Sequence, residues 1–169
     1  MDATALRALQ APIKDRYRST PDAAVVTLRA RGTLDDGSIA CKVETGRALA
    51  IAGLHPATGG SGAELCSGDM LLEALVACAG VTLKAVATAL AIELRSGTVK
   101  AEGDLDFRGT LGVDKGAPVG FRSIRLSFEV DSPAPQDQID QLLKLTERYC
   151  VVFQTLNVKP TLDVALHRT

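Results

Sequence analysis

The stretch MLLEALVACAGVTLKAVATALAIEL, residues 70–94, is the most apolar part of this chain and decides its fold. Ser67 offers an N-cap before it, and Asp69 places an acid in the first turn, where it complements the helix dipole. Ser96 and Gly97 are expected to end the helix. We therefore expect one helix from about residue 68 to about residue 94. Because it is apolar nearly all round, this helix must be surrounded by protein.

The environment of this helix follows from its small and its charged residues. Ala77, Ala79 and Gly80 would let another helix approach closely, which favours a helix pair at the centre of a dimer. The run is about long enough to cross a bilayer. Glu73 and Lys84 interrupt it, however, and a central charge costs ~2.5–3.5 kcal/mol to insert. A helix in a protein core is therefore expected, and a membrane span is not.

The N-terminal third predicts a short helix followed by a meander of short strands. Residues 4–11 have a helical pattern, which Pro12 would end. Turns are predicted at Asp36-Gly37 and at Thr45-Gly46, between β-branched or alternating segments. The strands expected from this pattern are residues 23–30, 38–44 and 47–52. One proline and several glycines make residues 55–63 a loop.

The C-terminal half predicts two long strands, a helix pair and a last strand. Residues 98–108 alternate, with a break near Gly103, and a glycine-rich connection leads to a cleanly alternating strand over residues 122–130. A helix is expected over residues 136–148, and Cys150 opens a further helical turn or two up to Leu156. Residues 161–166 (TLDVAL) predict a closing strand. The order of strands, long helix, strands, helix and strand predicts an α+β fold.

Composition narrows the class of protein. With 169 residues and 46% apolar content, the chain suits one domain. Its formal net charge of −1 provides no positive electrostatic field that would attract nucleic acid, and the sequence shows no basic stripe. Binding of nucleic acid is therefore not expected. The N-terminus shows no secretory signal, so a reducing cytoplasm is expected. The four cysteines are far apart, and no spacing of histidines and cysteines fits a zinc site, so neither a disulfide framework nor a metal is expected.

Two cysteines lie at the heart of separate apolar helical runs, in CSGDMLLEALVAC (residues 66–78) and in YCVVFQTL (residues 149–156). These segments resemble the OsmC/Ohr family of osmotically inducible and organic-hydroperoxide-resistance proteins. The resemblance covers about residues 23–166 and leaves residues 1–22 as an N-terminal extension. It implies an OsmC-like fold, an intertwined homodimer and a thiol-dependent peroxidase. Cys78 would be the peroxidatic cysteine and Cys150 the resolving one. Organic hydroperoxides would be the substrates and an external dithiol the reductant, without metal or organic cofactor.

The family also holds its thiolate with an arginine and a glutamate. Asp69 is nearest to the family acid, which some subgroups carry where this chain has Gly68. For the arginine the candidates are Arg47 or Arg29, with Arg31, Arg18 or His55 as substitutes. This chain departs from the family pattern at Val151, where proline is usual. Burial would raise the pKa of the Cys78 thiol, so we expect a cation beside it.

Each of these residues also has a purely structural interpretation. Cys78 and Cys150 are equally compatible with ordinary core packing, because free cysteine is among the most buried residue types. Cys41 and Cys66 are expected to be incidental. Asp69 is nine residues before Cys78 and about half a turn away on one helix, so it caps its own helix or orients a cation. Two other functions remain open: a non-catalytic protein that binds an apolar small molecule at the dimer interface, and a thiol redox sensor.

Overall fold

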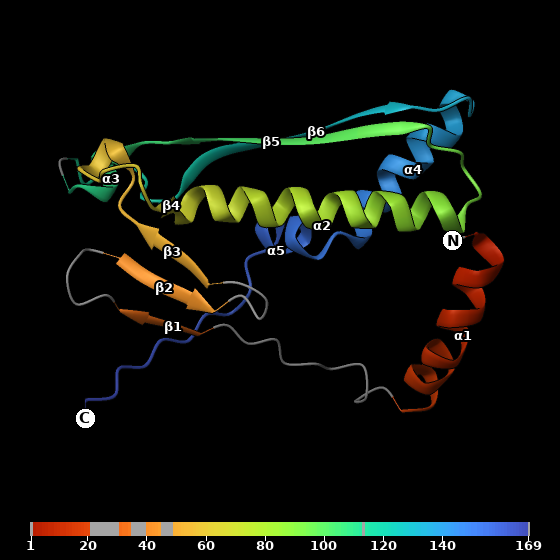
Figure 1. Cartoon of the computed structure of the whole chain (residues 1–169), viewed down its shortest axis with the longest axis horizontal. Coiled ribbons are helices and arrows are strands. Elements are labelled where there is room, and N and C mark those ends of the chain that lie inside the picture. Colours follow the sequence, from red (N-terminus) through yellow and green to blue (C-terminus); the bar gives the residue numbers. More distant parts are fainter. Residues whose placement is uncertain (1, 21–30, 35–39, 45–48, 113, 169) are drawn as a thin grey trace.

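A computed structural model describes residues 2–20, 31–34, 40–44, 49–112 and 114–168 of the chain (Figure 1). In chain order its elements are α1 (Ala3–Ser19), β1 (Arg31–Leu34), β2 (Ala40–Glu44), β3 (Leu49–Gly53), the 3₁₀ turn η2 (Pro56–Thr58), β4 (Leu65–Cys66), α2 (Ser67–Ala89), β5 (Ser96–Leu105), α3 (Phe107–Thr110), β6 (Phe121–Asp131), α4 (Gln136–Tyr149) and α5 (Val151–Asn157).

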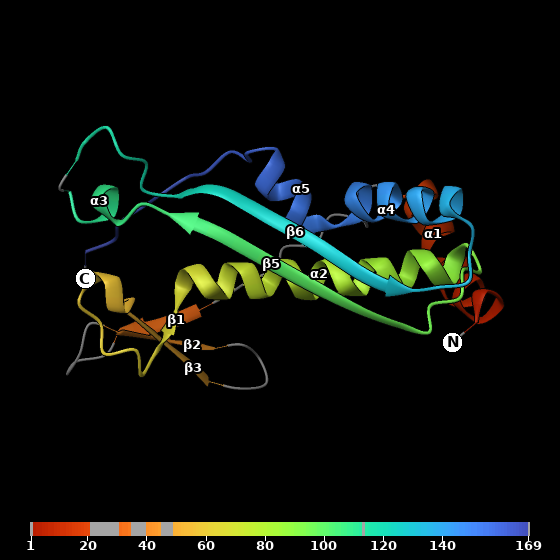
Figure 2. The ribbon, with the colours of Figure 1, turned by 90° about the horizontal axis from the view of Figure 1, so that it is seen from above.

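The strands form two separate sheets among the described residues. In the first, the order is β1-β2-β3-β4, with β1 and β2 antiparallel, β2 and β3 antiparallel, and β3 and β4 parallel. In the second, β5 and β6 form a long antiparallel ribbon. The ribbon lies along α2 (Figure 1) and crosses over it when seen from above (Figure 2). The α+β class is confirmed, and α2 is the central helix.

One stripe of α2 forms the core of the chain. Leu75, Ala79, Leu83 and Ala87 recur at every fourth position and are buried. They pack against the inner faces of the ribbon and of α4, where Leu142 is buried. On the other side of α2, the described residues leave Val81 72% exposed. By length and composition alone α2 could cross a membrane. In the structure one face packs on the ribbon and on α4, whereas the expected burial on all sides is not found among the described residues.

Helix α2 begins where it was predicted, but its N-cap and its C-terminal end differ from the prediction. Cys66, not Ser67, is the N-cap, and no side chain caps the helix there. The helix ends at Ala89 rather than near Leu94, because Ala91 takes a left-handed backbone (φ 56°) and the Ile92 N–H donates to the carbonyl of Ala87. Ile92 is nevertheless buried against Leu142, so the apolar pattern continues past the end of the helix.

Two predicted interruptions are also wrong. Helix α1 runs through Pro12 to Ser19, so this proline removes one helical hydrogen bond without ending the helix. Strand β5 runs through Gly103 and is irregular only between Asp104 and Leu105. A Cβ at Gly103 would lie 2.4 Å from the Phe121 ring, so the absence of a side chain at Gly103 lets that ring approach the strand closely. Beyond β5, residues 107–110 form α3 rather than the end of the strand.

The remaining predicted elements mostly match. Strands β2 and β3 lie within the expected meander, while the expected strand at residues 23–30 and the two turns lie outside the described residues. The strand over residues 122–130, the helix over 136–148 and the helical turns after Cys150 are confirmed as β6, α4 and α5. The loop over residues 55–63 contains only η2.

The closing strand predicted at residues 161–166 does not form. The alternating apolar residues of this segment find no strand partner among the described residues of the same chain. As a result, Leu162, Val164 and Leu166 are 71%, 98% and 95% exposed. A strand needs a neighbouring strand for its backbone hydrogen bonds, and the sequence pattern alone does not supply one.

Candidate active site

Two thiols far apart in the chain meet on one face of α2. Cys78 lies near the middle of this helix and is partly exposed, whereas Cys150 joins α4 to α5 and is 1% exposed. They share one cluster with the buried residues Leu75 and Ala79. Both cysteines are free, and each thiol affects the pKa of the other.

The backbone around Cys150 explains how the second thiol is placed. Its N–H donates to the Thr146 carbonyl at 2.9 Å and so closes α4, while its carbonyl accepts from Gln154 N–H at 2.9 Å and so opens α5. Between them Cys150 itself is extended (φ −73°, ψ 106°). The Gln154 side chain also donates to the Glu147 carbonyl at 2.7 Å, which ties the two helices together. The first turn of α5 is thereby fixed against α4, and its Val152 and Phe153 pack on the cluster of Leu75 and Ala79.

Opposing effects act on the Cys78 thiol. Burial raises its pKa and is the largest single effect. Against it act the N–H group of Val152, the thiol of Cys150, the N–H group of Val151 and the hydroxyl of Thr82, each of which lowers the pKa. Together these donors outweigh burial, so the pKa of Cys78 lies below its ordinary value.

The Cys150 thiol is shifted the other way. Burial raises its pKa most, and its hydrogen bond to Cys78 and the charge on Cys78 raise it further. The N–H groups of Phe153 and Val152 lower it, but they do not reverse the direction. Cys78 therefore ionises first and Cys150 keeps its proton, as a nucleophile and a neutral partner would require.

The sequence did not reveal these donors. The sequence indicated that the N-terminus of α5 would favour an anion at Cys150. For Cys78 it led us to expect a neighbouring cation. In the structure the first turn of α5 faces both sulfurs, and the lowered pKa of Cys78 has backbone and thiol donors as its causes. The helical pattern after Cys150 predicted free N–H groups at the start of that helix. Their contact with α2 is a tertiary contact, which the sequence of neither segment indicates.

Asp69 lies away from the thiol pair. It is in the first turn of α2, and its Cα is about 14 Å from that of Cys78 along the helix axis, at 1.5 Å per residue. It lines a cavity of about 360 Å³ with His55 and Cys66. Its position suits the helix dipole, one of the two roles expected for it.

His55 belongs to the same distant cavity. Its ring stacks on Phe107, with centroids 4.9 Å apart and planes 18° apart, and its Nδ1 accepts from Ala57 N–H at 3.0 Å. These contacts hold His55 at the N-terminal end of α2, so it does not take the place of the expected arginine. The arginine candidates Arg29 and Arg47 lie outside the described residues.

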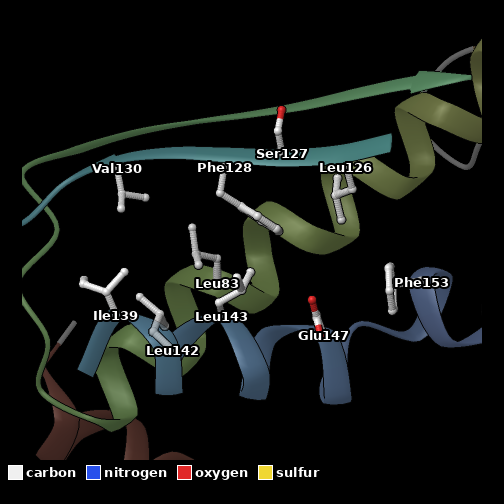
Figure 3. A pocket seen from close by; sticks show the side chains of 10 residues that line it. All are labelled: Leu83, Leu126, Ser127, Phe128, Val130, Ile139, Leu142, Leu143, Glu147 and Phe153. Atoms are coloured by element: carbon white, nitrogen blue, oxygen red, sulfur yellow. The ribbon is translucent and has the colours of Figure 1, made fainter. Parts of the chain in front are cut away.

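Two apolar cavities flank Phe153, whose N–H contacts the Cys150 thiol. The first, about 310 Å³, lies between β6, α2 and α4; there Leu126, Phe128 and Val130 point inward while Ser127 points away (Figure 3). The second, about 590 Å³, lies between α2, β6 and α5. Its lining is Leu71, Leu75, Gly120, Phe121, Arg122, Ser123, Ile124, Leu126, Phe153, Leu156 and Asn157.

Comparison with known proteins bears on this arrangement. The family profile of the OsmC-like proteins matches residues 60–165, more than half of the chain. No curated protein sequence matches it. The solved OsmC-like protein of Mycoplasma pneumoniae is similar, with a TM-score of 0.64 and 20% identity over 78% of this chain and 88% of that one.

Two further solved structures carry functional names. One is an organic hydroperoxide resistance protein OsmC from Legionella pneumophila (TM-score 0.60, 17% identity, 79% of this chain and 90% of that one). The other is the organic hydroperoxide resistance protein OhrB of Bacillus subtilis (TM-score 0.52, 17% identity, 78% and 93%). At such identities these likenesses show a shared fold.

Proposed function

This chain belongs to the OsmC-like protein family, and from that premise we propose that it is a thiol-dependent peroxidase that reduces organic hydroperoxides. Cys78 is the peroxidatic cysteine and Cys150 the resolving one. The observation that supports this proposal is the contact between the two thiols together with the opposite directions of their pKa shifts. The names of the similar Legionella and Bacillus proteins agree with it.

The proposed reaction uses these two residues in sequence. The Cys78 thiolate attacks the terminal oxygen of the hydroperoxide, the O–O bond breaks, and the alkoxide leaves as an alcohol after taking a proton. Cys78 is then a sulfenic acid. The Cys150 sulfur attacks the Cys78 sulfur, water leaves and a disulfide forms, which prevents further oxidation. An external dithiol, as expected in a reducing cytoplasm, returns both cysteines to thiols.

The family arginine has two candidates in this chain, Arg47 and Arg29. In the proposal one of them adds a positive charge near Cys78, while Asp69, in the first turn of α2, stabilises its own helix. The donors of α5 lower the pKa of Cys78 without that charge, so the arginine increases a reactivity that the described residues already support. Organic hydroperoxides suit the site because its surroundings are leucine, valine and alanine.

We also propose that the working form is a homodimer. On α2, Ala74 and Val81 are exposed and lie one turn before and one turn after Cys78. The thiol is therefore at the border between the covered and the uncovered face of the helix. A second copy on the uncovered face would also give the apolar segment at residues 161–166 a neighbour. Its apolar side chains would surround the approach to Cys78.

The experiment is to mix reduced protein with cumene hydroperoxide and follow thiol loss. Wild type should lose two thiols per peroxide, far faster than a free thiol does. Cys78→Ser should abolish the fast loss, whereas Cys150→Ser should leave a sulfenic acid that dimedone captures. Cys66→Ser is the matched control and should behave as wild type. Thiol loss in wild type at the rate of a free thiol would contradict the proposal.

A second candidate function is the binding of an apolar small molecule without chemistry. The cavity of about 590 Å³ favours it, because its size and apolar lining are those of ligand sites. Fluorescence of N-phenylnaphthylamine should then rise on binding. It should be lost in Leu156→Asp, which lines this cavity, and kept in Leu143→Asp, which lines the smaller one. A redox sensor would instead form the disulfide once, without repeated turnover in the presence of a dithiol.

A further inference from the structure

Thr82 lies one helical turn after Cys78. Residues four apart on a helix share a face, so the two side chains are neighbours on α2. The Thr82 hydroxyl donates to the Cys78 carbonyl at 2.8 Å, and the threonine is partly buried. The hydroxyl is therefore held directly over the residue that carries the reactive sulfur.

Other threonines of the chain make the same bond to the carbonyl of a residue that is not a cysteine. Thr88, Thr146 and Thr155 each donate to the carbonyl four residues earlier at 2.8 Å. The residues that carry those carbonyls are Lys84, Leu142 and Val151, and their side chains hold no acceptor for a hydroxyl. At Thr82 the corresponding side chain is a thiol that becomes an anion, so this hydroxyl has two acceptors within reach.

We propose that the Thr82 hydroxyl turns from the Cys78 carbonyl to the Cys78 sulfur when the thiol ionises. A hydroxyl hydrogen rotates to suit its acceptor, and a charged acceptor forms the stronger hydrogen bond. The carbonyl loses nothing essential, because it keeps its N–H partner within the helix. Thr82 thus joins the N–H groups of Val151 and Val152 as a donor to the thiolate.

This inference rests on the proposed reactivity of Cys78, and it assigns that residue a side-chain donor from its own helix. The N–H groups of α5 approach the sulfur from one segment and the hydroxyl approaches from another. Thr82 would therefore both favour the anion and fix its direction. The effect depends on the hydroxyl and not on the two other substituents of the Thr82 Cβ.

The test measures alkylation of Cys78 by iodoacetamide across the pH range of thiol ionisation, resolved by peptide mass spectrometry. Thr82→Val keeps the shape and removes the hydroxyl. It should slow alkylation of Cys78 at neutral pH about three- to tenfold and move the profile to higher pH. Thr82→Ser should restore the wild-type profile. Thr88→Val, which removes the same bond ten residues after Cys78, should leave that profile unchanged.

Several results would overturn the inference. One is a wild-type profile in folded Thr82→Val. Another is a Thr82→Ser profile like that of Thr82→Val, and a third is an equal change in Thr88→Val. Each would show that Thr82 has only a structural role. Should Thr82→Val fail to fold, Thr82→Ala is measured in its place against the same expectation. Iodoacetamide needs no turnover, so a protein that fails to reduce cumene hydroperoxide would refute the proposed function and leave this test intact.

Discussion

Cys78 and Cys150 share one cluster and each shifts the pKa of the other, although one lies within α2 and the other between α4 and α5. The first turn of α5 supplies N–H groups to both sulfurs, and the N–H of Val152 faces each of them. The pair is therefore arranged so that the Cys78 thiol ionises more readily than the Cys150 thiol. The predictions below follow from this asymmetry and from the packing around it.

The two thiols should titrate in a fixed order. Because the pKa of Cys78 is lowered on folding and that of Cys150 is raised, alkylation should modify Cys78 at lower pH. Ionised Cys78 contributes stability that is present above its unfolded pKa and lost as pH falls through its folded pKa. Cys150 contributes stability that is present below its unfolded pKa and lost as pH rises through its folded pKa. Site-resolved mass spectrometry checks the order, and modification of Cys150 first would refute it.

Replacing either arginine candidate tests whether a cation assists Cys78. Arg29→Gln or Arg47→Gln should slow the reaction with cumene hydroperoxide about tenfold, the effect of raising a thiol pKa by about one pH unit. Stopped-flow thiol loss is the measurement. Arg95→Gln is the control, since Arg95 is exposed and pairs with Glu93 and Asp131. Wild-type rates in both candidate variants would mean that the donors of α5 and Cys150 suffice.

A side chain at Gly103 should destabilise the ribbon. Gly103→Ala places a Cβ 2.4 Å from the Phe121 ring, so the ring must move, at about 1–3 kcal/mol of unfolding free energy. Gly97→Ala on the same strand is the matched control, because its nearest atoms are 3.5 Å away. Urea unfolding should separate the two variants, and equal stability would contradict the close approach of Phe121.

A charge on the uncovered face of α2 should prevent dimer formation. Val81→Asp places a carboxylate one turn after Cys78 on the face where the proposed second copy packs. Light scattering after size exclusion should show half the wild-type mass. Val119→Asp, at a 65% exposed position in the loop before β6, should stay dimeric. A monomeric wild type, or a dimeric Val81→Asp, would contradict the homodimer.

The parts of the fold that could be predicted from the sequence are those with local periodicity. Strand β6 and helix α4 follow directly from alternation and helical spacing. The end of α2 could not be placed, because Ile92 continues the apolar pattern after Ala91 has turned the backbone. Gly103 did not break β5, because propensity is weak against tertiary packing, here that of the Phe121 ring. Pro12 did not end α1. The closing strand at residues 161–166 failed because pairing is a property of two segments.

The candidate site also has a part that could be predicted from local sequence and a part that could not. Both cysteines could be selected from their positions in helical runs, but their environments could not. The donors to Cys78 come from Val151 and Val152, in a different helix, and the sequence offered only a cation as the means of ionising the thiol. Asp69 was selected by its nearness in the sequence, and the helix carries it about 14 Å away.

The most direct test of this account is to treat reduced protein with one equivalent of cumene hydroperoxide, block the remaining thiols and map the disulfides by mass spectrometry. We predict an intramolecular Cys78–Cys150 disulfide, with Cys41 and Cys66 still reduced. Cys78 and Cys150 both left as thiols, or a disulfide formed only with another cysteine, would contradict the central claim that these two residues act as one redox pair.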